Sequence, residues 1–228
     1  MNKLIIKEKN EQVSLNTINN LQNKLLFDIG SNIGKWAKKN YYNNKIICVE
    51  ASPACYNLLQ NNLKMYENIV CLNYAVCGSS NNTVEFYEAL NCNTISTLNV
   101  DWLSSNISRF NGTPYNKIIV NTISIDKLIE LYGMPNLIKI DVEGGEYECI
   151  KSLNIKVECI CFEWASEMRE ITIKCLDHLD KLGYTQFYCQ YEDAYNFRPT
   201  IYDDNIESLK QRILNTTPKK EWGMIWCK

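Results

Sequence analysis

The chain has 228 residues, 46% of them hydrophobic and 22% charged, and its formal net charge is −2. These values indicate a globular protein with a full core, and they argue against a nucleic-acid binder, which normally carries a basic surface. No apolar run has the length of a transmembrane helix, and the first residues lack the apolar stretch of a secretion signal, so we expect no contact with a membrane. The eleven cysteines form no C-x-x-C pair, so we expect reduced thiols and a cytoplasmic location.

Short β-branched runs alternate with helical patterns along the chain, which is typical of βαβ units and a parallel sheet. Ser52 followed by Pro53 marks one helix start, because serine caps the helix and proline fits its first turn. Core strands are expected over residues 24–30, 45–51, 69–76, 137–142 and 156–164, and final strands over 184–190 and 222–227. Helices are expected from residues 33, 53, 126 and 146, and over 167–182.

The segment between the third and fourth core strands departs from this alternation. An edge strand over 83–89 and a strand over 117–125 enclose residues 90–116, which show no clean periodicity. We interpret 90–116 as an irregular insertion in a single domain, residues 23–228, which follows an N-terminal extension at residues 1–22.

The first strand-to-helix turn, "FDIGSNIGKW", has the features of a ligand-binding turn. Gly30 lets the backbone turn sharply and approach a ligand, and Glu50, at the end of the next strand, is placed to accept hydrogen bonds from ribose hydroxyls. The third glycine of the dinucleotide fingerprint is missing, which favours a nucleoside with an amino-acid tail over a pyrophosphate. S-adenosylmethionine is such a ligand, and Asp28 could hold its ammonium group through water.

Five motifs, in this order, resemble those of the FkbM-type family of S-adenosylmethionine-dependent O-methyltransferases: "FDIGSNIGKW", "VEASP", "NYAVCG", "TISIDKL" and "LIKIDVEGGEYECIKSL". The resemblance covers residues 25 to about 164, and "KIDVEG-x-E" is its most specific part. It implies an α/β fold of the Rossmann-like class I type, a doubly wound, mostly parallel seven-stranded sheet whose last strand is antiparallel. It also implies O-methylation of hydroxyls on sugars or polyketide-like small molecules.

The resemblance also implies which residues bind the cofactor. Residues of the first turn would hold the methionine end, residues after the second strand the ribose, and residues after the third strand the adenine. Asp141 ends the fourth core strand opposite the transferable methyl group. The full set is Asp28, Gly30, Ser31, Asn32, Gly34, Glu50, Ala51, Ser52, Asn73, Tyr74, Ala75 and Asp141.

Methyl transfer to a sugar hydroxyl requires a base or a metal near the methyl group, because such hydroxyls are weak acids. Asp141 and Glu163 end neighbouring strands, so either is a candidate base, and Glu143 is a third candidate. We expect Glu146 to favour a helix start through the helix dipole and Glu148 to be solvated. A magnesium or calcium ion bound by Asp141 and Glu163 is an open alternative, but it is not favoured, because two carboxylates without a third ligand make a weak site.

The insertion is the expected acceptor site, because its aromatic side chains suit stacking on a sugar ring. Its candidate substrate-binding residues are Ser96, Thr97, Trp102, Arg109 and Tyr115. His178, the only histidine, lies on a helix expected to cover the sheet, so we assign it a structural role.

The preferred function is O-methylation of a small-molecule or glycan hydroxyl, with glycan sugars favoured. Two alternatives are cap-ribose 2′-O methylation of nucleic acid and an inactive Rossmann-like interaction module. The first alternative commonly uses lysines beside the target ribose, whereas we expect Lys139 to point into the fourth core strand. The second alternative does not explain why Gly30, Gly34, Glu50 and Asp141 occur together, because an interaction module has no use for them. The chain is also compatible with being one domain of a larger glycan-synthesis protein.

Overall fold

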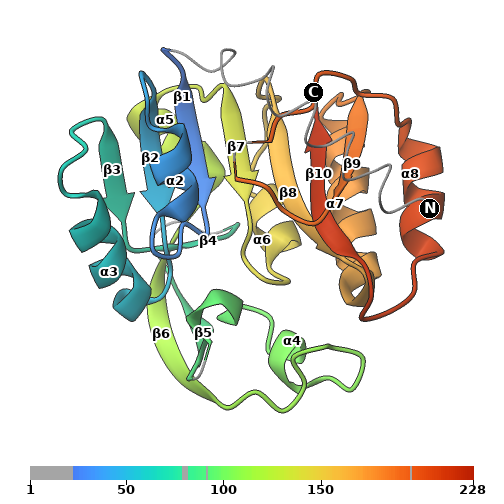
Figure 1. Ribbon diagram of the computed structural model, residues 1–228, viewed down its shortest axis with the longest axis horizontal. Helices are drawn as coiled ribbons and strands as arrows, with labels where there is room; N and C mark the ends of the chain where they lie inside the picture. The colour runs from blue at the N-terminus through green and yellow to red at the C-terminus, as the bar shows by residue number, and fades with distance from the viewer. Residues whose placement is uncertain (1–22, 79–81, 91, 196) are drawn as a thin grey trace.

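The computed structural model describes residues 23–78, 82–90, 92–195 and 197–228, so the expected extension at 1–22 lies outside the described residues. A seven-stranded sheet forms the centre of the molecule (Figure 1). Its strands, in order across the sheet, are β3 (Ile69–Leu72), β2 (Lys45–Val49), β1 (Leu25–Ile29), β7 (Leu137–Ile140), β8 (Ile160–Ala165), β10 (Trp222–Cys227) and β9 (Phe187–Tyr191). The pairs from β3 to β8 are parallel, and β10 runs antiparallel to both β8 and β9. The predicted mostly parallel sheet with an antiparallel last strand is confirmed.

Helices cover both faces of this sheet, as a doubly wound fold requires (Figure 1). One face packs α2 (Lys35–Asn40) and α3 (Pro53–Leu63) against alternate residues of the strands. The opposite face packs α5 (Ile125–Tyr132), α6 (Glu146–Ile150), α7 (Arg169–Lys181) and α8 (Ile206–Leu214). The central strands are buried on both sides, which explains their nearly continuous apolar sequences. No helix among the described residues combines the length and apolarity needed to cross a bilayer.

Local sequence signals explain where several elements begin. The Ser52 hydroxyl accepts a hydrogen bond from the Cys55 amide at 3.1 Å, so the predicted cap and start of α3 are confirmed. Ser124 caps α5 in the same way, and the strand predicted over 117–125 therefore ends at Ile123. Helix α8 was not predicted from the sequence.

The third core strand is shorter than expected, because the chain leaves the main sheet at Asn73. β3 ends at Leu72, and β4 (Ala75–Val76) pairs instead with β6 (Tyr115–Ile123). β6 also pairs with β5 (Thr83–Ala89), which completes a small three-stranded sheet. This sheet lies beyond the carboxyl ends of β1, β2 and β7 (Figure 1).

The insertion over 90–116 is more ordered than the sequence suggests. It contains a 3₁₀ turn, η1 (Asn93–Ile95), and a short helix, α4 (Asp101–Ser104), which belong to a separate small core. Buried Trp102 and Leu103 pack there with Ala165 and Met168, from the end of β8 and η2 (Ser166–Met168). Clean periodicity is absent from the sequence because these helices are too short to produce it.

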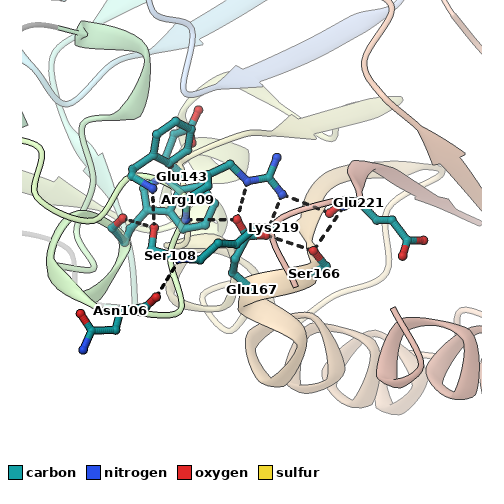
Figure 2. Close-up of polar contacts among 10 residues, drawn as sticks. Asn106, Ser108, Arg109, Glu143, Ser166, Glu167, Lys219 and Glu221 are labelled. Carbon is teal, nitrogen blue, oxygen red and sulfur yellow. Dashed lines mark hydrogen bonds and ion pairs between the residues drawn. The ribbon is translucent and has the colours of Figure 1, made fainter. Parts of the chain in front are cut away.

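A buried ion pair fixes the insertion to the end of β8 (Figure 2). The Arg109 guanidinium binds both carboxylate oxygens of Glu167, whose side chain has no exposed surface. Arg109 also donates to the carbonyl oxygen of Glu221, and Lys219 Nζ donates to that of Asn106 at 2.8 Å. The insertion is therefore attached both to η2 and to the segment before β10.

The turn after β1 lies very close to the end of β7. Gly30 has φ +76°, and a Cβ atom on it would lie 1.7 Å from the carbonyl oxygen of Asp141. The turn can therefore approach the end of β7 only if residue 30 has no side chain.

We expect Arg109→Ala to lower the free energy of unfolding by about 3 kcal/mol, because it leaves the Glu167 carboxylate buried without its partner. Urea unfolding monitored by circular dichroism measures the change. Lys127→Ala, which removes an exposed pair with Glu130, is the control and should change little. Equal effects in the two variants would contradict the structural role of Arg109.

We expect Gly30→Ala to destabilise the fold more than Gly112→Ala does. Both residues have positive φ, a conformation that costs an alanine about 1 kcal/mol, but a Cβ on Gly112 would meet nothing within 4 Å. The Gly30 variant should therefore lose at least about 2 kcal/mol in urea unfolding, because overpacking adds to the backbone cost. Equal losses would show that the close approach to Asp141 is unimportant.

Candidate active site

A cavity of about 580 Å³ opens at the carboxyl ends of β1, β2, β7 and β8. Ligands of open α/β sheets bind in this position. Eight of the twelve predicted cofactor residues line it: Gly30, Ser31, Asn32, Glu50, Ala51, Tyr74, Ala75 and Asp141. All three predicted catalytic carboxylates line it as well: Asp141, Glu143 and Glu163.

Glu50 lies in the cavity wall with both carboxylate oxygens held by the backbone. The amide of Asn32 donates to one oxygen and the amide of Ser52 to the other, each at 2.8 Å. Burial raises the pKa of Glu50 to about 7, although these two hydrogen bonds oppose the shift. The carboxylate is thus fixed in orientation, as the recognition of two adjacent hydroxyls requires.

An apolar wall continues from Glu50 toward the three-stranded sheet. Tyr74, Ala75 and Val76 follow the departure of the chain from β3, and Phe86 of β5 completes the wall. An aromatic ring such as adenine fits a surface of this kind. Phe86 was not predicted, because residues 83–89 were interpreted only as an edge strand.

Four predicted cofactor residues do not line the cavity and support it instead. Ser52 caps α3, and the Asn73 side-chain amide donates to the carbonyl oxygens of Glu50 and Ala51. A Cβ on Gly34 would lie 2.8 Å from Leu63, so this glycine allows helix packing. Asp28 is completely buried. The predicted part of these four residues in cofactor binding therefore stays a prediction.

Lys139 reaches the cavity, contrary to the expectation that it points into its strand. Lys139 and Asp28 are register partners on β7 and β1, and their side chains form an ion pair at 3.4 Å. Lys139 Nζ also lies 3.1 Å from Asp141 and donates to the Gly30 carbonyl oxygen at 3.2 Å. Burial lowers the pKa of Lys139, but the charges of Asp141 and Asp28 outweigh burial and raise it above its usual value.

Asp141, Glu143 and Glu163 come together at one end of the cavity, where one oxygen of each lies within 4.8 Å of the others. Glu143 has φ +56°, so the chain turns its side chain back toward Asp141. Burial, followed by the charges of the neighbouring acids, raises the pKa values of Glu143 and Glu163 well above their usual range. The sequence argument against a metal assumed that only two carboxylates meet at this site, but Glu143 provides a third. Three carboxylate oxygens at this spacing could hold a divalent cation or accept a proton.

The carboxylates of the trio differ in their protein partners. Asp141 pairs with Lys139, and Glu143 accepts a hydrogen bond from the Trp102 indole at 2.9 Å. The Glu163 carboxylate makes no hydrogen bond with any residue that the structure describes, and it faces the cavity. Glu163 is therefore the least constrained acid of the three.

Glu146 is buried and braces the turn between Asp141 and α6, a role beyond the expected helix electrostatics. Its carboxylate accepts hydrogen bonds from the amides of Val142 and Gly144, both at 3.2 Å. Glu148, by contrast, forms a partly exposed ion pair with Lys151, as expected of a surface residue. His178 contacts the carbonyl oxygen of Leu153 at 2.8 Å, consistent with its structural role.

Four of the five predicted substrate-binding residues lie outside the cavity wall, and only Ser96 lines it. Trp102 and Thr97 point toward Glu143, with the Thr97 hydroxyl donating to the Glu143 carbonyl oxygen at 2.6 Å. Arg109 pairs with Glu167 (Figure 2), and Tyr115 contacts Tyr87 edge to face. These contacts show that the aromatic residues of the insertion help to build it, and their predicted stacking on an acceptor stays a prediction.

Several lining residues were missed by the sequence analysis. Trp222 and Met224 of β10 and Asp193 and Tyr195 of the preceding loop come from the C-terminal part, where no motif was recognised. Met224 is the register partner of Glu163, so the topology alone brings it to the trio. Lys35 and Lys39 on α2 also line the cavity; their spacing of four residues was the available signal.

Solved structures with a similar chain path include several methyltransferases. Precorrin-6y C5,15-methyltransferase from Geobacter metallireducens is 12% identical, with a TM-score of 0.48, and the match covers 95% of this chain and 86% of that one. Aeropyrum pernix fibrillarin in complex with S-adenosyl-L-methionine is 11% identical, with a TM-score of 0.47 and coverage of 96% and 74%. At these values the likeness carries no argument about function. No curated protein matches the sequence.

The comparison with protein-family models assigns this chain to a family, which the structural comparison does not do. The family model for the methyltransferase FkbM domain matches residues 28–198, which include the first turn, Glu50, the carboxylate trio and Asp193. The match covers well over half of the chain. The protein therefore belongs to the FkbM family of S-adenosylmethionine-dependent methyltransferases.

Proposed function

We propose that the protein methylates a hydroxyl group of a sugar, in a glycan or glycoconjugate. The observation that carries this proposal is the meeting of Asp141, Glu143 and Glu163 at one end of the cofactor cavity, with their oxygens within 4.8 Å of one another. A hydroxyl acceptor needs a group that removes its proton, and this end of the cavity is where carboxylates are concentrated.

A sugar is the acceptor class that suits this end of the cavity best. Carboxylates accept hydrogen bonds only, and a polyhydroxylated ring donates several at once. Trp222 lines the same cavity and offers an aromatic surface for the apolar face of a pyranose. Capped RNA fits less well, because its phosphates would approach three acidic side chains.

Glu163 is the residue that we assign as general base. It is free of protein hydrogen bonds among the described residues, and its raised pKa brings its basicity closer to that needed at neutral pH. S-adenosylmethionine supplies an electrophilic methyl group on a positively charged sulfur. Glu163 would take the hydroxyl proton as the acceptor oxygen bonds to the methyl carbon, while the carbon–sulfur bond breaks and leaves S-adenosylhomocysteine as a neutral thioether.

Asp141 and Glu143 would provide the electrostatic setting for this step. The carboxylate oxygens favour the binding of a cation, and Lys139 and Trp102 fix the orientation of Asp141 and Glu143. The contacts from Lys139 and Trp102 hold the side chains of Asp141 and Glu143 in place before any ligand binds. Little reorganisation of these side chains is therefore needed during the reaction.

The cellular setting is also a proposal. All eleven cysteines are free thiols, five of them in the strands β2, β3, β8, β9 and β10, which suits a reducing compartment such as the cytoplasm. The domain could act within a larger glycan-synthesis protein whose other parts make the acceptor.

We expect methyl transfer from labelled S-adenosylmethionine to saccharides and not to RNA. The assay incubates the protein with separate panels of free sugars, glycans and capped RNA, and measures label in each acceptor. Calorimetry with the cofactor is the control, since an inactive interaction module would not bind it. Transfer to RNA with none to any saccharide would overturn the proposed acceptor.

We expect Glu163→Gln to reduce turnover about 100-fold or more, a common effect of removing a general base. Cofactor affinity, measured by calorimetry, should stay nearly unchanged. Wild-type turnover should rise with pH as the Glu163 carboxyl group loses its proton, and the variant should lack this rise. A variant with full turnover, or a chelator-sensitive activity restored by Mg²⁺, would remove Glu163 from the role of base.

A further inference from the structure

Two lysines on one wall of the cavity have no charged partner within the described part of the chain. Lys35 and Lys39 are four residues apart on α2, are exposed, and line the cavity. Neither forms an ion pair with a residue that the structure describes. Lys139, the third lysine in the wall, is already bound to Asp28, Asp141 and the Gly30 carbonyl oxygen. Lys35 and Lys39 are thus the cations of the wall left for an anionic ligand group.

The loop after β9 forms another part of the wall and carries the acid Asp193 beside Tyr195. Gly223 lets the start of this loop lie against β10, because a Cβ on it would be 2.8 Å from the Glu192 backbone nitrogen. The side-chain amide of Asn40, at the end of α2, donates to the Tyr195 carbonyl oxygen at 2.9 Å. The loop and the lysine-bearing helix are therefore held in a fixed relation.

The anchoring continues through Arg198, which is buried between two indole rings. Its guanidinium carbon lies 5.2 Å from the centre of the Trp36 ring and 5.0 Å from that of Trp226. Arg198 also donates to the Asn40 side-chain oxygen at 2.9 Å. Asn40 is thus bound on both sides, so the position of the loop does not depend on a bound ligand.

The cavity wall carries both the positive and the negative charge that a zwitterion requires. Burial raises the pKa of Asp193 to about 6, with Lys139 opposing the shift, so the Asp193 carboxylate remains largely ionised at neutral pH. Lys35 and Lys39 present positive charge from α2, and Asp193 presents negative charge from the loop tied to that helix. Glu50 and the carboxylate trio lie at other parts of the same cavity.

We propose that Lys35 and Lys39 bind the carboxylate of the methionine moiety of S-adenosylmethionine and that Asp193 binds its ammonium group. The cofactor has a single anionic group, and these two lysines are its uncommitted cationic partners in the wall. The assignment rests on the family's cofactor and is independent of the acceptor. It replaces Asp28, which lies outside the cavity wall against Lys139, as the acid that contacts the ammonium.

The first test compares Lys35→Ala/Lys39→Ala with Lys38→Ala by calorimetry. Lys38 is an exposed lysine of the same helix that does not line the cavity, so it controls for the loss of positive charge. The double variant should bind S-adenosylmethionine at least about tenfold more weakly, the scale of one charge-assisted hydrogen bond. It should bind decarboxylated S-adenosylmethionine as tightly as the wild type does, and Lys38→Ala should match the wild type with both ligands.

The second test uses Asp193→Asn, which keeps the size of the side chain and removes its charge. This variant should bind both S-adenosylmethionine and its decarboxylated form more weakly, because both contain the ammonium group. It should bind 5′-methylthioadenosine, which lacks the amino-acid group, as the wild type does.

Two results would overturn the inference. One is a double lysine variant with wild-type affinity for S-adenosylmethionine; the other is an equal loss for all three ligands, which would indicate a non-specific electrostatic or folding effect. Thermal unfolding of each variant separates these cases. Failure of the proposed acceptor would leave every binding result intact, so the two proposals fail independently.

Discussion

The buried ammonium group of Lys139 joins the first turn of the sheet to the end of β7. It contacts Asp28 on β1, Asp141 after β7 and the Gly30 carbonyl oxygen, so three parts of the cofactor cavity depend on one side chain. Removing one partner of such a buried pair is far more costly than the pair is stabilising, because an uncompensated charge is left in the core. The Lys139 contacts also separate two acids that would otherwise repel each other. A lysine at position 139 is thus needed both to join β1 to β7 and to balance the charges of Asp28 and Asp141.

The parts of this protein that could be predicted from the sequence are those specified by neighbours in the chain. The strands of the main sheet, the Ser52 cap and the two-glycine turn each depend on local sequence. The structure contains all of them, although β3 ends at Leu72 and not at residue 76 as predicted. The convergence of Asp141 and Glu163 followed from their positions at the ends of adjacent parallel strands. These inferences needed only the topology, which the family resemblance supplied.

The parts that could not be predicted depend on contacts between distant segments. Arg109 and Trp102 looked like acceptor contacts because the sequence does not reveal Glu167 or Glu143 as their partners. Asp193 lies in a loop without periodicity or motif, so nothing local marked it as part of the cavity. Even within "KIDVEGGEYE" the four acids take four different roles, because the turn directs each side chain to a different environment.

The hydrogen bond from Trp102 to Glu143 has a consequence for engineering the enzyme. One residue of the insertion directly orients one of the three carboxylates, and Arg109 attaches the same insertion to η2. Exchanging residues 90–116 for the loop of a related protein would therefore alter the environment of Glu143 together with the part of the cavity wall formed by Asn93, Thr94, Ser96 and Leu98. A transplanted loop would need its own indole donor for Glu143 and its own cation for Glu167. One segment of the chain therefore contributes both to the cavity wall and to the orientation of Glu143.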